Sequence, residues 1–383
     1  MKSSIDSYDF IIAGMGAAGL SLAMQLKNSS VKFSRVLILD KQLKNTNDRT
    51  WCFWTRDTQA WYQEAVTRQW DCIEFKSDTF EKKFTISPYR YQLIRGIDFY
   101  SFCLQQLQVD SRFEIVTEEI KALRSDGAYG IVETVNSTYQ ASQVFNSAFR
   151  KAEVKKQHVN FVQHFKGWVI TTEQDFFDDS CPIFMDFKTA QNNDCRFFYV
   201  IPFSKKKALI EYTGFSRSSI ASEAYDAKIK EYIEKDLKLE TYTVIETEIG
   251  QIPMMESPFV NPYGVRITNI GTAGGNSKTS TGYTFYFIQK QVQSIVDHLE
   301  RGESLDTKKA KRHYKLYDKV LLDVMDKNRI SSDILFATLF KKNKIENLLA
   351  FLNEESSIMQ DLSVLNSVEK LPFLFSLITK LLN

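Results

Sequence analysis

The fold of this chain is decided by residues 8–40, YDFIIAGMGAAGLSLAMQLKNSSVKFSRVLILD. The apolar run at residues 8–13 is typical of a buried strand, and a GxGxxG motif follows it at residues 14–19. Apolar residues then recur at helical spacing, and a second apolar run ends at Asp40. This order of strand, glycine turn, helix and acid-ended strand predicts a Rossmann-type unit that binds a dinucleotide.

Each position of the motif has a physical task. Gly14 permits the tight turn, Gly16 lets the backbone approach a pyrophosphate, and Gly19 lets the helix pack on the strand. The N-terminus of the helix offers free N–H groups and a positive dipole to the phosphates. The carboxylate of Asp40 can accept hydrogen bonds from a ribose diol. We therefore expect cofactor contacts from Gly14, Gly16, Ala17, Ala18, Gly19 and Asp40.

A second glycine-rich loop, at residues 271–275, lies between a strand-like run and a long helical segment. Two well-separated loops of this kind fit a flavin dinucleotide better than a nicotinamide fold with one loop. We expect Gly271 and Gly274 to contact this cofactor. The backbone N–H groups of Thr281 and Gly282 should lie near the edge of the isoalloxazine ring.

The composition excludes several classes of protein. The 383 residues include 49 Lys and Arg against 47 Asp and Glu, so the formal net charge is +2. This balance argues against a nucleic-acid binder that relies on bulk charge. The 29 Phe, 17 Tyr and 5 Trp residues indicate a large apolar core. Five widely spaced cysteines predict neither a zinc site nor a disulfide framework, and we expect no bound metal.

The two ends of the chain bear on its location. The N-terminus lacks the pattern of a signal peptide, and no window approaches ~20 consecutive apolar residues. We therefore expect an intracellular protein that is soluble or bound to a membrane surface. The apolar C-terminal segment, residues 371–383, could lie in a membrane interface or pack on the core, and the sequence leaves both open.

Residues 161–215 contain several short aromatic runs of strand type, and one of them carries an unexpected acid. Strand alternation places Leu209, Glu211 and Thr213 on one face, with Tyr212 on the other. A carboxyl group on the pocket face of an apolar sheet has a raised pKa and can act as a general acid. An edge-strand glutamate that faces solvent is an equally open interpretation.

The segment at residues 47–54, NDRTWCFW, is dense in aromatic residues and follows the acidic strand end. Arg49 could meet a phosphate or a ring carbonyl, and Trp51 and Trp54 could line a pocket. Composition alone favours an aromatic loop that packs on the sheet.

The predicted fold class is α/β, with a Rossmann-type FAD-binding domain, an inserted antiparallel β-sheet substrate domain and a helical C-terminal region. The expected FAD-binding parts are residues 1–75, 113–160 and 261–300, the substrate domain takes residues 76–112 and 161–260, and the helical region is 301–383.

Taken together, these motifs resemble those of the FAD-containing lycopene cyclases of the bacterial β-cyclase type. The resemblance covers most of the chain, and the segments DRTWCFW, LIEYT and STGY in this order are its most specific part. The motifs that carry it are residues 9–19, 47–54, 185–187, 198–204, 208–213, 252–254, 271–275 and 278–283.

The resemblance implies a redox-neutral cyclisation of the ends of lycopene to β-ionone rings, through γ-carotene to β-carotene. It implies reduced FAD as cofactor and NAD(P)H as its reductant. Glu211 aligns with the essential glutamate of the family, and the aromatic pocket would include Trp51, Trp54, Phe203 and Tyr212. Because lycopene dissolves in membranes, the resemblance also implies a cytoplasmic protein that is peripherally attached to a membrane.

Two other functions compete with the cyclase. An FAD-dependent monooxygenase or reductase acting on a polyene or isoprenoid lipid would share the dinucleotide motif and the cavity. Related flavin hydroxylases typically carry an Asp in the second glycine loop, whereas this chain has Thr272, which weakens that alternative. A carotenoid- or flavin-binding module without catalysis would leave Glu211 unexplained. The type of ring, one-ended cyclisation, the donor of the first proton (Glu211 or the reduced flavin) and the oligomeric state stay open.

Overall fold

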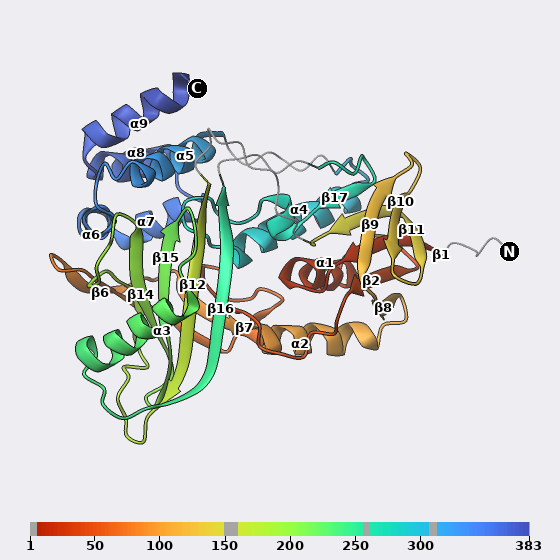
Figure 1. Cartoon of the computed structure of the whole chain (residues 1–383). Coiled ribbons are helices and arrows are strands. Elements are labelled where there is room, and N and C mark those ends of the chain that lie inside the picture. The colour runs from red at the N-terminus through yellow and green to blue at the C-terminus, as the bar shows by residue number, and fades with distance from the viewer. Residues whose placement is uncertain (1–5, 149–159, 256–260, 306–311, 383) are drawn as a thin grey trace.

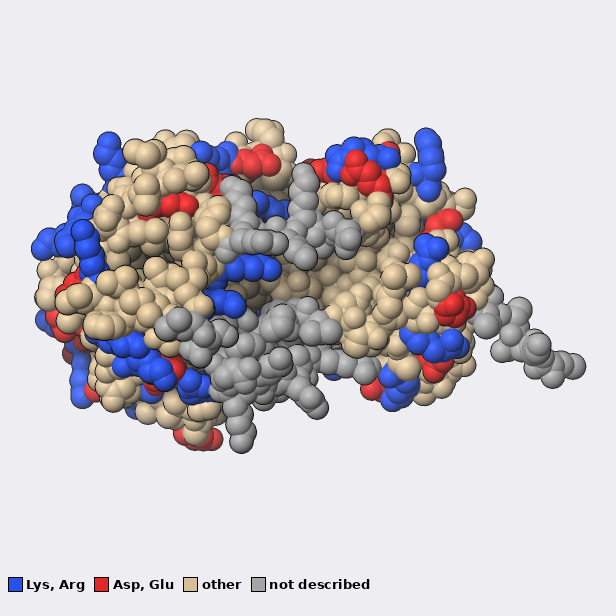
Figure 2. Space-filling view, turned by 90° about the horizontal axis from the view of Figure 1, so that it is seen from above, with Lys and Arg blue, Asp and Glu red and all other residues tan. Residues whose placement is uncertain are grey.

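The computed structural model describes residues 6–148, 160–255, 261–305 and 312–382 (Figure 1). These residues form a mixed sheet with a Rossmann unit, a large antiparallel sheet, a small sheet between them and a helical C-terminal region. The predicted α/β class and its three parts are thereby confirmed. From above, the surface is hollowed between two lobes, and Lys and Arg side chains border part of the hollow (Figure 2).

The first sheet is built from the predicted strand–helix–strand unit. β1 pairs in parallel with both β2 and β11, and α1 (Ala17–Lys27) connects β1 to β2. Apolar side chains of α1 pack against α4 (Phe285–Glu300) and α2 (Gly96–Gln108). The strand order is β8 (Phe113–Thr117), β2 (Val36–Asp40), β1 (Asp6–Ala13), β11 (Thr138–Asn146), β10 (Gly130–Thr134) and β9 (Ile120–Ser125), with β17 (Ile267–Asn269) also beside β11.

The second sheet is antiparallel except where β13 runs parallel to β5. One face is covered by α3 (Ser222–Glu231), which Figure 1 shows across the strands, and the π-helical turn Tyr232–Asp236 continues α3. The other face shares an aromatic core with the C-terminal helices. The strand order is β16 (Thr243–Met255), β12 (Asn160–Thr171), β15 (Lys207–Ser216), β14 (Cys195–Ser204), β13 (Ile183–Asp186), β5 (Cys72–Lys76) and β6 (Glu81–Thr85).

A three-stranded sheet and the C-terminal helices complete the part of the chain that the structure describes. The small sheet has the order β3 (Thr50–Thr55), β7 (Arg90–Arg95) and β4 (Arg68–Trp70). Among the described residues, no single helix is long and apolar enough to span a membrane, although α8 and α9, bent by 117°, pass that test as a pair. The C-terminal helices are α5 (Arg312–Asp326), α6 (Ser332–Lys342), α7 (Ile345–Leu352), α8 (Ile358–Ser367) and α9 (Lys370–Leu382).

Two segments differ from the expected division of the chain. β5, at residues 72–76, belongs to the large antiparallel sheet, so the expected boundary at residue 75 cuts through a strand of that sheet. α2 was expected in the substrate domain, but its Phe99, Cys103 and Leu107 lie in the same apolar core as α1. Both differences arise from long-range packing, which local sequence patterns do not specify.

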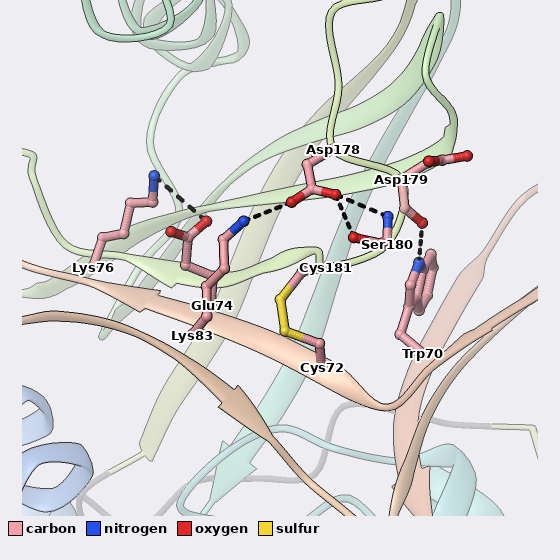
Figure 3. The surroundings of a disulfide bond; sticks show 9 residues. All are labelled: Trp70, Cys72, Glu74, Lys76, Lys83, Asp178, Asp179, Ser180 and Cys181. Atoms are coloured by element: carbon pink, nitrogen blue, oxygen red, sulfur yellow. Dashed lines mark hydrogen bonds and ion pairs between the residues drawn. A yellow bond between two sulfur atoms is a disulfide. The ribbon is translucent and has the colours of Figure 1, made fainter.

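The expectation of no disulfide is wrong, because Cys72 and Cys181 are joined (Figure 3). Their separation of 109 residues hides a close pairing, since β5 and β13 are neighbouring parallel strands with Glu74 opposite Ile183. Each cysteine lies two residues before that pair. The loop before β13 is also held against the sheet by an ion pair of 2.6 Å between its Asp178 and Lys83 of β6.

Candidate functional site

A cleft of about 460 Å³ opens beside the N-terminus of α1 and the end of β2. The N-cap of α1 is Gly16, and no side chain caps this helix terminus, which leaves it suited to an anion. The carboxylate of Asp40 accepts a hydrogen bond of 2.8 Å from the Met15 N–H and borders the cleft. We call this space the dinucleotide cleft, and its walls include Gly14, Gly16, Ala17, Ala18, Asp40 and Arg49.

The three motif glycines occupy different surroundings. Gly14 has a φ of +113°, and a Cβ there would lie 2.2 Å from the Ser147 hydroxyl. A Cβ on Gly19 would lie 1.9 Å from the Gly14 carbonyl oxygen, so this glycine allows the helix to pack on the turn. A Cβ on Gly16 would meet no atom within 4 Å, because it would project into the cleft. The three glycines thus have the surroundings that their predicted roles require: Gly14 for the tight turn, Gly19 for helix packing and Gly16 for the approach of a pyrophosphate.

The second glycine loop contributes differently from the prediction. A Cβ on Gly271 would lie 2.6 Å from the Cβ of Ala18, so Gly271 serves close packing and does not line the cleft. Gly274 borders a different surface depression. The N–H groups of Thr281 and Gly282 both donate to the Lys278 carbonyl, at 3.2 and 2.7 Å, and are not directed at a ligand. A hairpin-like turn within the loop uses these donors, and the sequence pattern alone did not indicate it.

A second cavity, of about 80 Å³, lies between the large sheet, the small sheet and the loop before α4. It is mostly apolar, yet two carboxyl groups, those of Glu211 and Glu248, face into it. We call this space the acid cavity. Trp51 and Thr284 line both the acid cavity and the dinucleotide cleft, so the two spaces adjoin. Aromatic side chains on the walls are Trp51, Tyr91, Phe165, Tyr199, Tyr283 and Phe285.

Glu211 lies at the centre of the large sheet. β15 pairs with β12 on one side and β14 on the other, so the interpretation as an exposed edge-strand acid is wrong. The side chain of Glu211 is only 8% exposed, and its Oε1 accepts a hydrogen bond of 2.8 Å from Thr213. Burial first, and then the nearby charge of Glu248, raise the pKa of Glu211 well above its usual value. This carboxyl group therefore holds its proton to a higher pH than an exposed glutamate does.

Glu248 is the residue that the sequence analysis missed. It lies on β16, is partly buried, and accepts a hydrogen bond of 2.6 Å from Thr50. Burial also raises the pKa of Glu248. Two acids alternate along β16, Glu246 and Glu248, and this alternation is the signal that could have indicated one acid-bearing face.

The four predicted pocket aromatics lie in four different environments. Trp51 lines the acid cavity as predicted. Trp54 is buried behind the cavity, where its indole N–H donates to the Leu349 carbonyl and its ring contacts Tyr283. Phe203 is half-buried outside the cavity. The prediction for Tyr212 is wrong, because β-strand alternation turns its ring to the opposite face, onto Phe198 and the α3 cluster.

A buried ion cluster connects the second glycine loop to the C-terminal helices. The ammonium group of Lys278 lies 2.7 Å from Asp318 on α5 and 2.8 Å from Glu354 after α7. Although burial acts to lower it, the two carboxylates raise the pKa of Lys278. A charge held this way fixes the loop that supplies Gly282 and Tyr283 to the acid cavity.

Comparison with known proteins gives a consistent result. A family model described as "Lycopene cyclase protein" matches residues 9–377. A lycopene beta-cyclase from Pantoea ananas is 23% identical over 292 residues, which cover 72% of this chain and 71% of that protein. A geranylgeranyl bacteriochlorophyll reductase-like structure from Thermoplasma acidophilum has a TM-score of 0.62 at 11% identity and covers 99% of both chains. A variant of HpxO from Klebsiella pneumoniae, complexed with FAD, has a TM-score of 0.65 at 11% identity and covers 91% of this chain and 98% of that one. The fold is therefore that of FAD-binding oxidoreductases.

Proposed function

Because this chain belongs to the lycopene cyclase family, we propose that it closes the ends of lycopene into β-ionone rings, through γ-carotene to β-carotene. The reaction conserves the mass of the substrate and involves no net electron transfer. The observation that carries this proposal is a buried carboxyl group with a raised pKa, Glu211, in an aromatic cavity that adjoins a dinucleotide cleft.

The residues of the dinucleotide cleft fit FAD. The open space at Gly16 and the uncapped N-terminus of α1 suit a pyrophosphate, and the carboxylate of Asp40 suits a ribose. In the acid cavity, the buried Gln163 Oε1 has no hydrogen-bond partner among the described residues, which suits a ligand N–H. When bound, reduced FAD would supply negative charge beside a cationic substrate. NAD(P)H as the reductant stays a prediction.

The carboxyl group of Glu211 can perform acid–base chemistry on an alkene. Its proton is transferred to the terminal double bond of the substrate, which leaves a tertiary cation on the adjacent carbon. The neighbouring double bond attacks this cation, closes the six-membered ring and moves the positive charge into the ring. Loss of a ring proton to a carboxylate then forms the ring double bond, so the proton is returned.

The walls of the acid cavity are suited to carbocations. Rings such as those of Trp51, Tyr199 and Phe165 present π-systems and exclude water that would otherwise trap a cation. Cation–π attraction contributes about 0.5–2 kcal/mol for each well-placed ring. The phenols of Tyr199 and Tyr283 stay neutral, because burial raises the pKa of both.

We further propose that the C-terminal helices contact a lipid surface, where lycopene is dissolved. α8 and α9 carry exposed apolar side chains, and the basic residues Lys341 and Lys342 end α6 while Lys370 begins α9, a combination that suits an anionic membrane. A cytoplasmic location stays a prediction. The apolar set is Ile358, Met359, Leu362, Leu371, Leu374, Phe375, Ile378 and Leu381.

The test is pigment analysis in a lycopene-producing host that expresses the flavin-loaded protein or its Glu211→Gln variant. We expect γ- and β-carotene from the wild type and a loss of about 10²–10⁴-fold in the variant, since the neutral amide cannot donate a proton. Flavin content should be equal in both.

Glu74→Gln is the matched control, because Glu74 is a buried acid of the same sheet outside both spaces, and it should retain activity. Unchanged lycopene with a folded, flavin-loaded wild type would refute the cyclase. Stoichiometric consumption of O₂ or NAD(P)H would instead support a monooxygenase or reductase.

A further inference from the structure

We infer that Glu248 is the proton partner of Glu211, that the two carboxyl groups hold one proton between them, and that Gly167 makes this sharing possible. The inference rests on the proposed cyclisation and deepens it by naming the group that holds Glu211 protonated. Glu248 acts through Glu211 and is therefore a positioning residue.

The register of three strands brings the two acids together. Gly167 on β12 lies directly opposite Glu211 on β15 and directly opposite Glu248 on β16. Residues in register on adjacent strands project to the same face, so both glutamates flank one position that has no side chain. A Cβ on Gly167 would lie 3.4 Å from the Cβ of Glu211 and 3.3 Å from the Cγ of Glu248. The two side chains therefore converge over the glycine, and both line the acid cavity, where each carboxyl group acts on the pKa of the other.

Each carboxyl group has its own hydroxyl donor. Thr213 donates to Glu211, and Thr50 of the NDRTWCFW segment donates to Glu248. In each acid, one carboxyl oxygen accepts a hydrogen bond from a threonine hydroxyl, and the other oxygen is available to the second glutamate. Thr50 therefore has a structural role, as the hydrogen-bond donor to Glu248, that the sequence did not indicate.

Burial, hydrogen bonds and nearby charges act differently on the two acids. Burial raises the pKa of Glu248 and the hydrogen bond from Thr50 lowers it, while the charge of Glu246 acts to raise it and that of Arg49 to lower it. The other facing groups stay neutral, because burial raises the pKa values of their thiol and phenols. The pKa of Glu211 is raised more strongly than that of Glu248, so the pair holds its proton mainly on the Glu211 side. These neutral neighbours are Cys52 on β3, Tyr91 on β7, Tyr199 on β14 and Tyr283 before α4.

The shared proton suits both halves of the reaction. When Glu211 gives its proton to the alkene, a new C–H bond replaces the O–H bond, and the pair becomes doubly negative beside the substrate cation. Two adjacent carboxylates in an apolar cavity repel each other and form a strong base. The pair then takes back the proton that the ring loses, so the resting state is restored with no oxidant or reductant consumed.

The experiment uses flavin-loaded protein and two readouts, the pH profile of cyclisation and the infrared C=O band of a protonated carboxyl group. Glu248→Gln keeps the shape and the Thr50 contact but removes the negative charge. We expect the carboxyl band to persist in this variant and its midpoint to move down by about one pH unit, because one charged neighbour is lost. The alkaline limb of the pH profile should shift with it. Gly167→Ala should also lower the midpoint, by separating the pair.

Glu246→Gln is the matched control, since it removes a charge two residues away on the same strand. An equal shift in this control, or an unchanged midpoint in Glu248→Gln, would overturn the inference. So would the absence of any protonated carboxyl band in the wild type near neutral pH. A wild type that shows the band and the shift but does not cyclise lycopene would instead count against the proposed function alone.

Discussion

His164 is a buried residue whose protonation state should control stability at mildly acidic pH. Its ring is 1% exposed and hydrogen-bonds Ser216 at 2.9 Å and Tyr225 at 2.7 Å. Burial, followed by the charge of Arg196, lowers the pKa of His164 from 6.5 to about 4. In the unfolded chain the ring binds a proton below about pH 6.5, while the folded protein does not, so stability falls as the pH drops.

We expect the free energy of unfolding to fall by about 1 kcal/mol between pH 7.5 and 5.5, because His164 binds a proton in the unfolded chain only. His164→Gln keeps polar partners for Ser216 and Tyr225 but does not titrate. Urea unfolding of both proteins at the two pH values isolates the contribution, because all other groups cancel. The stability difference between them should narrow at pH 5.5, and a constant difference would show that His164 does not titrate as described.

Single residues were predictable from sequence where local chemistry stands out. Glu211 is an acid within an apolar strand, and that contrast made it a candidate. Glu248 lies in a strand with several polar residues, so its alternation with Glu246 is only a weak local signal. The role of Gly167 follows only from the register of β12 with two other strands. Tyr212 shows the converse error, because a motif neighbour of the acid was assigned to the pocket although alternation excludes it.

At the scale of elements, the turn between β1 and α1 should separate folding from cofactor binding. Gly16→Ala has a backbone φ of −79°, which any residue tolerates, and its Cβ meets no atom within 4 Å. We expect the cofactor-free variant to unfold within about 1 kcal/mol of the wild type. Its affinity for FAD should fall at least about tenfold, which corresponds to roughly 1.4 kcal/mol, because the methyl group occupies the approach of the pyrophosphate.

Gly19→Ala is the informative contrast. Its Cβ would lie 1.9 Å from the Gly14 carbonyl oxygen, so this variant should lose stability before any ligand is added. Isothermal titration with FAD and thermal unfolding of the cofactor-free proteins distinguish the two effects. Unaltered FAD affinity in Gly16→Ala would mean that the cleft does not hold a pyrophosphate at this turn.

Elements were predicted best where a motif and a periodicity agreed. The segment from β1 to β2 was anticipated almost residue by residue, since glycine spacing, helical spacing and strand runs all specify it. The function of the loop at residues 271–284 was predicted less well. Its glycines and N–H groups serve internal packing and turns, and the same glycine spacing is compatible with either this internal role or cofactor binding.

For the whole molecule, the sequence indicated the fold class but not how distant segments combine. The antiparallel sheet takes β5 and β6 from before residue 90 and five strands from after residue 159, so its core joins parts that composition cannot connect. The disulfide between Cys72 and Cys181 follows from that same junction. The sheet topology therefore explains why the expected boundary at residue 75 and the expected absence of a disulfide were both wrong. Local sequence patterns carry little information about sheet topology.

The C-terminal helices give the molecule an apolar surface that should control access of a membrane-dissolved substrate. On α9 the exposed residues recur as one helical stripe, and Phe375 is 57% exposed at its centre. Each buried CH₂ group contributes about 0.8 kcal/mol when it leaves water, so two charges in this stripe should abolish the contact. We expect the wild type to sediment with anionic lipid vesicles and the variant Leu374→Glu/Ile378→Glu to remain in the supernatant. Cyclisation of vesicle-dissolved lycopene should fall with it, while activity in detergent micelles should stay near that of the wild type.

Val109→Glu/Val265→Glu is the control, because both valines are highly exposed but lie outside the C-terminal helices, Val109 at the end of α2 and Val265 in the turn before β17. It adds the same charge and should bind vesicles like the wild type. A variant that loses activity equally in vesicles and micelles would place the role of α9 in folding. A wild type that fails to bind any vesicle would refute the membrane contact while leaving the chemistry of the acid cavity untouched, because Glu211 and Glu248 lie on strands of the large sheet and not on these helices.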